Sequence, residues 1–328
     1  AAGVVGFNRG TVTGVTVSGS VTGGDFVGGL VAENRGSITD SRSMATVDGA
    51  DNVGGLVGEN DGWVNDSTAT GSVDGIGAVG GLAGGNGGSV RDVRATGSVD
   101  GVTSVGGLIG YLSDFQGGRV IRSAATGDVS ATAPDSDTQV ERVGGLIGGN
   151  YGTVIDSTAS GDVTIDAGNA VRVHGVGGLV GTSGSRAPAS DAVIRNGTAM
   201  GAVTVASGSD YIGGLVGDNF GLVSTSTART TVEANGRYVG GLTGRNLGTI
   251  STSVVTGTVV ATNDGSQLVG GLVGRNRGLV NTSYAIADVD APYRVGGLIG
   301  DNGGTVRYSY AAGDVDGSAI VGGLIGTA

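Results

Sequence analysis

Apolar residues recur along this chain at a nearly constant spacing. A Val-Gly-Gly-Leu block, with isoleucine once in first place, starts at residues 27, 53, 79, 105, 143, 176, 212, 239, 269, 295 and 321. The commonest interval is 26 residues, and each longer interval contains an insertion. Self-similarity at such a period predicts a repeat architecture, in which each unit buries its apolar face against the next.

The repeat at residues 53–78 reads VGGLVGENDGWVNDSTATGSVDGIGA. It has no 3.6-residue apolar stripe, and its glycines and β-branched residues disfavour a helix. We expect three short strands, at 53–58, 63–69 and 71–75, separated by turns that contain glycine. They bury a face only when an identical unit lies about 4.8 Å away. The pattern therefore predicts an all-β, right-handed parallel β-solenoid of about eleven coils, roughly 50 Å long.

Three apolar columns are expected to form the core of this solenoid. The leucine column begins with Leu30, Leu56 and Leu82, and two columns of valine or isoleucine run through Ile38 and Val47. Side chains at equivalent places in successive coils stack directly on one another. We therefore expect these three columns to point inward.

Asn34, Asn60 and Asn86 begin a polar column, with each asparagine in the pattern N-x-G. A row of asparagines could form a ligand site. We favour a buried ladder, in which each side-chain amide hydrogen-bonds to the turn of the next coil. A serine column that includes Ser41 and Ser67 suggests a second ladder. Both columns are interpreted as scaffold.

We expect residues 1–328 to form a single solenoid, and we interpret the chain as a piece of a longer protein because it begins and ends within a repeat. Insertions are expected as loops at 111–118, 130–142, 164–175, 182–192, 205–210 and 260–268. Solenoid insertions often carry recognition. Residues 111–142 and 164–192 are therefore the predicted partner-binding surface, with tolerated surface variation as the alternative.

Composition argues against several classes of function. The chain has no cysteine, which removes disulfides, thiolate metal sites and cysteine nucleophiles. Its net charge of −11 argues against nucleic acid as a partner, and no apolar run is long enough to span a membrane. All 18 basic residues are arginine, and most acidic residues are aspartate. Such surfaces are typical of proteins from salt-loving archaea, with codon bias in a GC-rich genome as the alternative.

The recurring pattern GGL(V/I)G-x-N-x-G-x-(V/I) resembles the GLUG motif of bacterial and archaeal surface proteins. The resemblance covers essentially the whole chain. It implies a cell-surface or secreted location and a role in adhesion, and it supplies no catalytic residue. The motif is a structural module found in many proteins, so it defines fold better than function.

Aspartates form the one candidate metal site. Asp48, Asp74 and Asp100 occupy equivalent places in three successive coils, and Asp290 and Asp316 do so in two more. Carboxylates stacked about 4.8 Å apart repel one another unless salt screens them or a cation bridges them. We therefore expect salt cations or Ca²⁺ to stabilise the fold, and no organic cofactor.

Little in the sequence indicates catalysis. His174 is the only histidine, and its place in an insertion suggests an exposed loop residue. Carboxylates at 135–141 and 162–166 could share a face and support a carbohydrate-acting enzyme, which remains a distant alternative. We expect no enzyme.

Three asparagines lie in N-x-S/T sequons: Asn65, Asn196 and Asn281. Such sequons suit a glycosylated surface protein, although some arise by chance in a chain rich in serine and threonine.

Two functions remain open. The first is a non-catalytic extracellular rod that mediates or presents adhesion to a cell-surface or matrix ligand. The second is a subunit or decoration of an extracellular filament or surface layer, joined to its own copies or to other surface proteins through the solenoid ends.

Overall fold

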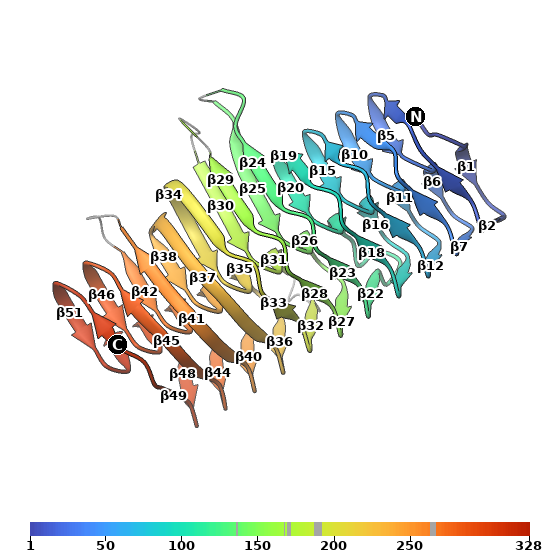
Figure 1. Cartoon of the computed structure of the whole chain (residues 1–328). Helices are drawn as coiled ribbons and strands as arrows, with labels where there is room; N and C mark the ends of the chain where they lie inside the picture. Colours follow the sequence, from blue (N-terminus) through green and yellow to red (C-terminus); the bar gives the residue numbers. More distant parts are fainter. Residues whose placement is uncertain (136, 167, 169–171, 187–191, 263–266) are drawn as a thin grey trace.

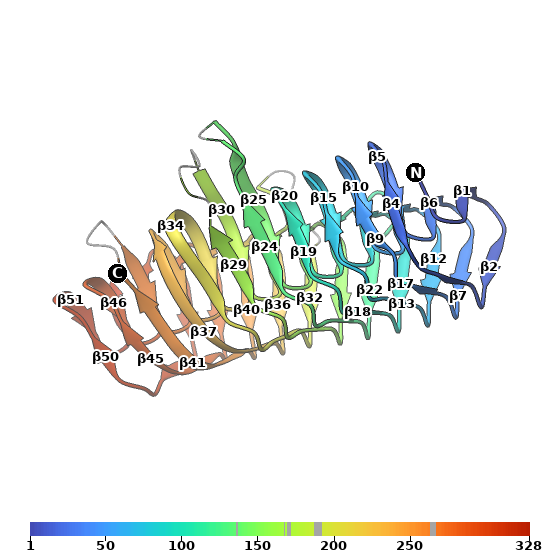
Figure 2. The same cartoon turned by 45° about the horizontal axis from the view of Figure 1, so that its top comes forward.

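The computed structural model describes residues 1–135, 137–166, 168, 172–186, 192–262 and 267–328. They form an elongated stack of coils that runs from one terminus to the other (Figures 1 and 2). Successive coils pair in parallel, as Val57 does with Val31 and Ala83. The described residues contain no helix, and so none that could cross a membrane. The predicted all-β solenoid of about eleven coils is confirmed.

The strands of the described residues form three sheets. The first has 12 strands, one from each turn of the chain: β1 (Val5–Asn8), β6 (Val31–Asn34), β11 (Val57–Asn60), β16 (Ala83–Asn86), β21 (Ile109–Leu112), β26 (Ile147–Asn150), β31 (Val180–Ser183), β35 (Val216–Asn219), β39 (Thr243–Asn246), β43 (Val273–Asn276), β47 (Ile299–Asn302) and β52 (Ile325–Thr327). The second has 11 strands: β2 (Thr11–Thr13), β7 (Ser37–Thr39), β12 (Trp63–Asn65), β17 (Ser89–Arg91), β22 (Arg119–Ile121), β27 (Thr153–Ile155), β32 (Val193–Arg195), β36 (Leu222–Ser224), β40 (Thr249–Ser251), β44 (Leu279–Asn281) and β48 (Thr305–Arg307).

The third sheet joins the remaining 29 strands: β3 (Thr16–Val17), β4 (Ser20–Thr22), β5 (Asp25–Gly28), β8 (Arg42–Ser43), β9 (Thr46–Asp48), β10 (Asp51–Gly54), β13 (Thr68–Ala69), β14 (Val73–Asp74), β15 (Gly77–Gly80), β18 (Arg94–Ala95), β19 (Val99–Gly101), β20 (Thr103–Gly106), β23 (Ala124–Ala125), β24 (Val129–Thr132), β25 (Gln139–Gly144), β28 (Thr158–Ala159), β29 (Val163–Asp166), β30 (Arg172–Gly177), β33 (Thr198–Ala199), β34 (Val203–Gly213), β37 (Thr227–Gly236), β38 (Tyr238–Gly240), β41 (Val254–Ala261), β42 (Leu268–Gly270), β45 (Tyr284–Asp290), β46 (Tyr293–Gly296), β49 (Tyr310–Ala311), β50 (Val315–Asp316) and β51 (Ala319–Gly322).

The prediction of three strands in each coil is wrong in detail. The expected strand 53–58 is divided between β10 and β11 by a bend, and 63–69 is divided between β12 and β13. Asp66, between β12 and β13, has a left-handed φ of 47°, and Asn52 in β10 has a φ of 51°. Equivalent residues in other coils share this conformation, most of them not glycine. The corner at Asp66 therefore separates β12 from β13, whereas the corner at Asn52 lies within β10 and the bend at 55–56 separates β10 from β11.

Most of the core of the described residues lies in two clusters along the length of the solenoid. Leu30, Leu56 and Leu82 are fully buried in the first cluster together with Ile38. Val47 is fully buried in the second. Burying each such side chain stabilises the fold by about 1.5–3 kcal/mol. The repeated columns supply this energy in every coil.

The glycine pair of each block is required by close backbone packing. A Cβ on Gly54 would collide with the carbonyl oxygen of Val57, and one on Gly55 with that of Gly81 in the next coil. Neither glycine has a positive φ. Space, and not backbone conformation, therefore excludes a side chain at both positions.

The asparagine column is a buried, hydrogen-bonded ladder. The Nδ2 of Asn34 donates to Oδ1 of Asn60 at 2.7 Å, and the Nδ2 of Asn60 donates to Oδ1 of Asn86 at 2.6 Å. The Oδ1 of Asn34 also accepts from the backbone N–H of Gly36 in its own turn, at 3.2 Å. The amides thus bond mainly to one another. Leu112 stands next in register after Asn86 and interrupts the ladder.

Several insertions extend strands instead of forming loops. Insertion residues 130–132, 139–142, 164–166 and 172–175 lengthen the paired strands β24, β25, β29 and β30, which project on one side of the stack (Figure 1). β34 runs through 205–210. Val140 and Val173 are buried in the second core cluster. Residues 136, 167, 169–171, 187–191 and 263–266 of the predicted insertions lie outside the described residues.

Candidate ligand grooves beside a glycine-rich coil

One coil carries smaller outward side chains than its neighbours. Its residues 77–89, here called the glycine-rich coil, read GAVGGLAGGNGGS. Three of its positions lie in register between larger residues of the adjacent coils: Gly77 between Asp51 and Thr103, Gly85 between Glu59 and Tyr111, and Ser89 between Trp63 and Arg119. Because side chains are missing from the middle coil, the surface is depressed at two places.

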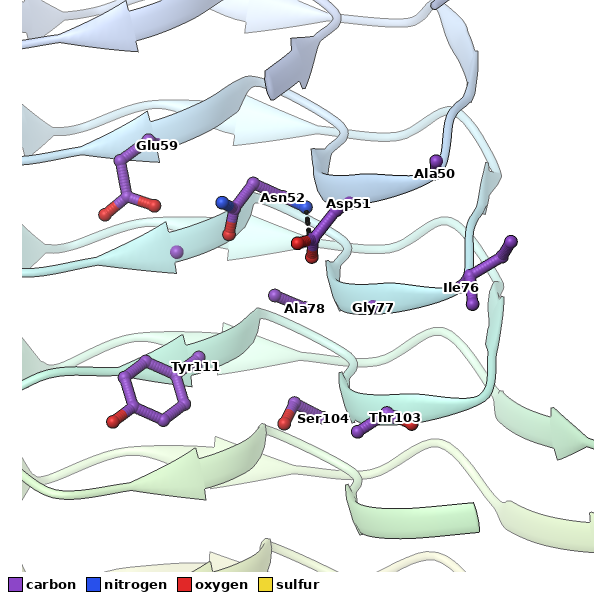
Figure 3. A pocket seen from close by; sticks show the side chains of 11 residues that line it. Ala50, Asp51, Asn52, Glu59, Ile76, Gly77, Ala78, Thr103, Ser104 and Tyr111 are labelled. Carbon is purple, nitrogen blue, oxygen red and sulfur yellow. Dashed lines mark hydrogen bonds between the residues drawn. The ribbon is translucent and has the colours of Figure 1, made fainter. Parts of the chain in front are cut away.

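The first depression is a groove of about 530 Å³, here called the Glu59 groove. It is lined by Ala50, Asp51, Asn52, Glu59, Ile76, Gly77, Ala78, Gly85, Thr103, Ser104 and Tyr111. Figure 3 shows Glu59 and Asn52 on one side, Tyr111 and Ser104 on the other, and Ala78 between them. One wall is therefore acidic and the other carries an aromatic ring.

Acidic side chains lie over the glycines that form the groove floor. The Glu59 carboxylate occupies the space that a Cβ on Gly85 would fill. The Oδ1 of Asp51 lies 2.8 Å from the position that a Cβ on Gly77 would take. Both acids come from the preceding coil. The small residues of the glycine-rich coil thus set where these carboxylates lie.

The environment of the Glu59 carboxyl group disfavours its ionised form. Burial first, and then the charges of Asp61, Glu33 and Asp51, raise its pKa to about 7. None of the ion pairs among the described residues includes Glu59. At neutral pH this group can therefore donate or accept a hydrogen bond. A cation or a ligand hydroxyl group beside it would offset this effect.

The second depression, here called the Trp63 groove, has a volume of about 480 Å³. It is lined by Asp61, Trp63, Asn65, Gly88, Ser89, Arg91, Gln116, Gly117 and Arg119. Trp63 is the only tryptophan of the chain, and it is 65% exposed. The groove combines an open indole face with amide, carboxylate and guanidinium groups.

His174 is not the exposed loop residue that its insertion predicted. It lies in β30, and its side chain is 23% exposed. Its ring meets Tyr211 edge-on with centroids 4.5 Å apart, and its Nε2 is 4.0 Å from Oδ2 of Asp218. Burial, followed by the charges of Arg172 and Arg245, lowers the pKa of His174. The histidine is therefore part of a packed surface cluster.

A buried ion pair forms the centre of that cluster. Asp218 is 1% exposed and accepts hydrogen bonds from Nε and Nη2 of Arg245, the former at 2.9 Å. The guanidinium carbon lies 3.7 Å from the ring centroid of Tyr211, and Nη1 donates to the Tyr211 hydroxyl at 2.6 Å. A cavity of about 250 Å³ adjoins the pair. The polar groups of Asp218, Arg245 and Tyr211 are thus hydrogen-bonded to one another.

The predicted aspartate columns are in register. Asp74 pairs with Asp48 and Asp100, and Asp290 pairs with Asp316. Burial, followed by the charges of Asp100 and Asp48, raises the pKa of Asp74. Within the described ranges, no three histidine or carboxylate side chains are grouped to hold a metal ion. A metal role for these columns remains a proposal.

The three sequon asparagines lie at the surface or partly exposed. Asn65 and Asn281 are half-buried, whereas Ser67 and Ser283 of their sequons are buried. Asn196 is exposed, with a left-handed φ of 52°. Asn65 also lines the Trp63 groove, so a glycan there would compete with a ligand.

The carboxylates considered for acid–base chemistry lie on different strands and in the segments beside them. Glu141 in β25 is in register with His174, and Asp166 in β29 is in register with Thr132. Asp135 accepts a hydrogen bond from the hydroxyl of Thr138 at 2.6 Å, which lowers its pKa. These contacts give no paired acid and base.

Neither groove was predicted from the sequence. The signal is the variable residue of the pattern VGGLVG-x-N, which reads Glu59, Gly85 and Tyr111 in three successive coils. Only a comparison of outward positions from coil to coil reveals a small residue between two large ones.

The fold and its ladders define a repeat-based structural protein. Residues 75–100 and 140–164 match the family model described as the GLUG motif. Two stretches of the chain therefore carry the GLUG motif. No curated protein and no solved structure matches it.

Proposed function

We propose that this chain is a non-catalytic, extracellular rod of a cell-surface protein that mediates or presents adhesion. The observation that supports the proposal is that the inward residues are the same from coil to coil, whereas the outward residues differ. The leucine column is constant, whereas the outward position on the first sheet changes from Glu59 to Gly85 to Tyr111. Such a scaffold can vary its recognition groups without altering its core.

The two grooves lie on paired strands of the solenoid, and this position favours a function in ligand binding. Glu59 lies in β11 and Trp63 in β12, and both strands pair with coils on either side. Sites built on strands are held more precisely than sites on loops. A cell-surface or matrix ligand is thus the expected partner. The GLUG resemblance supports the extracellular location.

Electron microscopy of the full-length protein on its own cells tests this proposal. Antibodies raised against the chain should label intact cells, and the purified protein should form separate rods of uniform length in high salt. Label that appears only after the cells are permeabilised would contradict the extracellular location. Long polymers with a regular axial repeat would favour the filament or surface-layer function instead.

A further inference from the structure

The side chain of Trp63 is largely exposed to solvent. It points outward from β12, while its neighbour Val64 is fully buried in the core. Its partners in register are Ser37 and Ser89, so serine is accommodated at the same place in both adjacent coils. An indole left open to water is unfavourable by itself. The indole face is therefore free to contact a ligand that enters the groove.

The gap beside Trp63 is two coil spacings wide. Ser89 forms the floor, and Arg119 stands on the far side in the same register. Two spacings amount to about 9–10 Å. That width admits one sugar ring lying flat on the indole, because the C–H faces of a pyranose are apolar and pack well on aromatic rings.

Polar groups with free hydrogen-bonding capacity surround the gap. Neither Gln116 nor the side chain of Asn65 has a hydrogen-bond partner among those that the described residues provide, and both line the groove. Gln116 belongs to the insertion 111–118, whose Phe115 is 90% exposed. Amide groups match the hydroxyl groups of a sugar as donors and acceptors. The groove thus offers stacking and hydrogen bonding together.

The charge of the groove selects an acidic ligand. Arg91 makes no ion pair within the described part of the chain, and Arg119 donates only to the carbonyl oxygen of Gly117, at 3.4 Å. The one carboxylate in the lining, Asp61, lies 3.6 Å from Arg35. The groove lining thus holds two guanidinium groups that are free of carboxylate partners among the described residues. They can form bidentate pairs with a carboxylate.

We propose that the Trp63 groove binds an acidic saccharide, with a uronic-acid ring stacked on Trp63 and its carboxylate held by Arg91 and Arg119. This inference rests on the proposed adhesive function and names its ligand class. Single-stranded nucleic acid could also stack on the indole. It requires a positive groove that follows several phosphates, and this groove has two arginines.

The single tryptophan reports on the groove directly. The full chain is titrated with an oligomer of galacturonic acid and, separately, with a glucose oligomer of equal length. Tryptophan fluorescence and calorimetry follow binding. The acidic oligomer should shift the Trp63 emission and bind at least about tenfold more tightly than the neutral one, because a charge-assisted hydrogen bond adds about that factor. A rise in NaCl concentration should weaken this binding.

Variants separate stacking from charge. By calorimetry, Trp63→Ser should weaken binding of the acidic oligomer about tenfold, and Arg119→Gln should reduce the preference for the acidic oligomer. Tyr308→Ser, at an exposed site near the other end of the chain, is the matched control and should bind as the parent does. Trp63→Ser should keep the thermal midpoint of the parent, since Ser37 and Ser89 occupy equivalent places.

Several outcomes would overturn the inference. These are no binding of the acidic oligomer, equal binding of the neutral oligomer, tighter binding of a single-stranded oligonucleotide, or undiminished binding by folded Trp63→Ser. Surface labelling of cells is measured separately. If antibodies label intact cells but the titration shows no binding, only the proposed saccharide ligand is contradicted. If the chain binds the saccharide but is found inside cells, only the proposed extracellular location is contradicted.

Discussion

Glu59 and Asp218 occupy the same position of the repeat, and the structure treats them in opposite ways. Both are acids at the outward place of the first sheet, in β11 and β35. The next coil places Gly85 beside Glu59 and Arg245 beside Asp218. One carboxylate lies unpaired in an open groove, and the other is buried in a bidentate ion pair. The residue in the neighbouring coil thus determines whether an outward acidic side chain lines a groove or is buried in an ion pair.

The largest expected effect comes from breaking the buried pair. Arg245→Met leaves the Asp218 carboxylate buried without its partner, so the free energy of unfolding should fall by about 3–5 kcal/mol. Urea denaturation measures it. Arg35→Met is the matched control, because Arg35 is exposed and lies 3.6 Å from Asp61, and it should change the free energy of unfolding by less than about 1 kcal/mol.

A double variant tests the same prediction further. Replacing Asp218 and Arg245 together with leucine should recover much of the lost stability, because no uncompensated charge remains. If Arg245→Met is as stable as the parent, Asp218 is not held as the structure shows.

Substitution of Glu59 is expected to change the free energy of unfolding by less, and in the opposite direction. The pKa of Glu59 is raised to about 7 in the folded chain from the ordinary glutamate value of 4.5, so the folded chain binds the proton more tightly than the unfolded chain does. This group therefore reduces stability as pH rises from about 4.5 to about 7, and the full loss is present above that range. Glu59→Gln should stabilise the protein at pH 8 by about 1–3 kcal/mol and have little effect at pH 4.

Urea denaturation of the parent and of Glu59→Gln at pH 4 and pH 8 measures this change in the free energy of unfolding. Glu233→Gln, at an exposed position of β37, is the control and should change the free energy of unfolding by less than about 0.5 kcal/mol. An equal effect of Glu59→Gln at pH 4 and pH 8 would contradict the assigned proton equilibrium.

The smallest effect is expected from the aspartate column. Asp74 lies between Asp48 and Asp100, and it is more exposed than Glu59. Asp74→Asn should raise the free energy of unfolding by less than about 1 kcal/mol at low salt and reduce the rise of the thermal midpoint with NaCl or Ca²⁺. A parent midpoint that is indifferent to NaCl, Ca²⁺ and chelator would rule out both screening and bridging.

The sequence predicted the scaffold because stacking forces equivalent positions to be alike. Leu56 must resemble Leu30 and Leu82, since each packs in the same core cluster. The breaks within strands were not predicted. Asp66 and Asn52 adopt left-handed corners, and no residue type that usually marks such corners repeats at those positions in every coil.

The grooves and the histidine cluster were missed for a different reason. A groove over Gly85 depends on residues one coil before and one coil after it, which are 26 positions away in each direction. His174 was placed in a loop because its segment interrupts the repeat. The structure instead pairs it with Glu141 and Asp210 in lengthened strands. Register between coils, and not local pattern, determines both features.

The most direct test of the account is a titration of the Glu59 carboxyl by carbon-13 NMR, in the parent and in Gly85→Ala. The missing side chain at Gly85 lets the Glu59 carboxylate lie in a recessed groove. A titration midpoint near pH 7 is therefore expected in the parent. In Gly85→Ala, the added methyl group should displace the carboxylate into water and lower the midpoint. An ordinary glutamate midpoint in the parent, or the same raised midpoint in both proteins, would contradict the account.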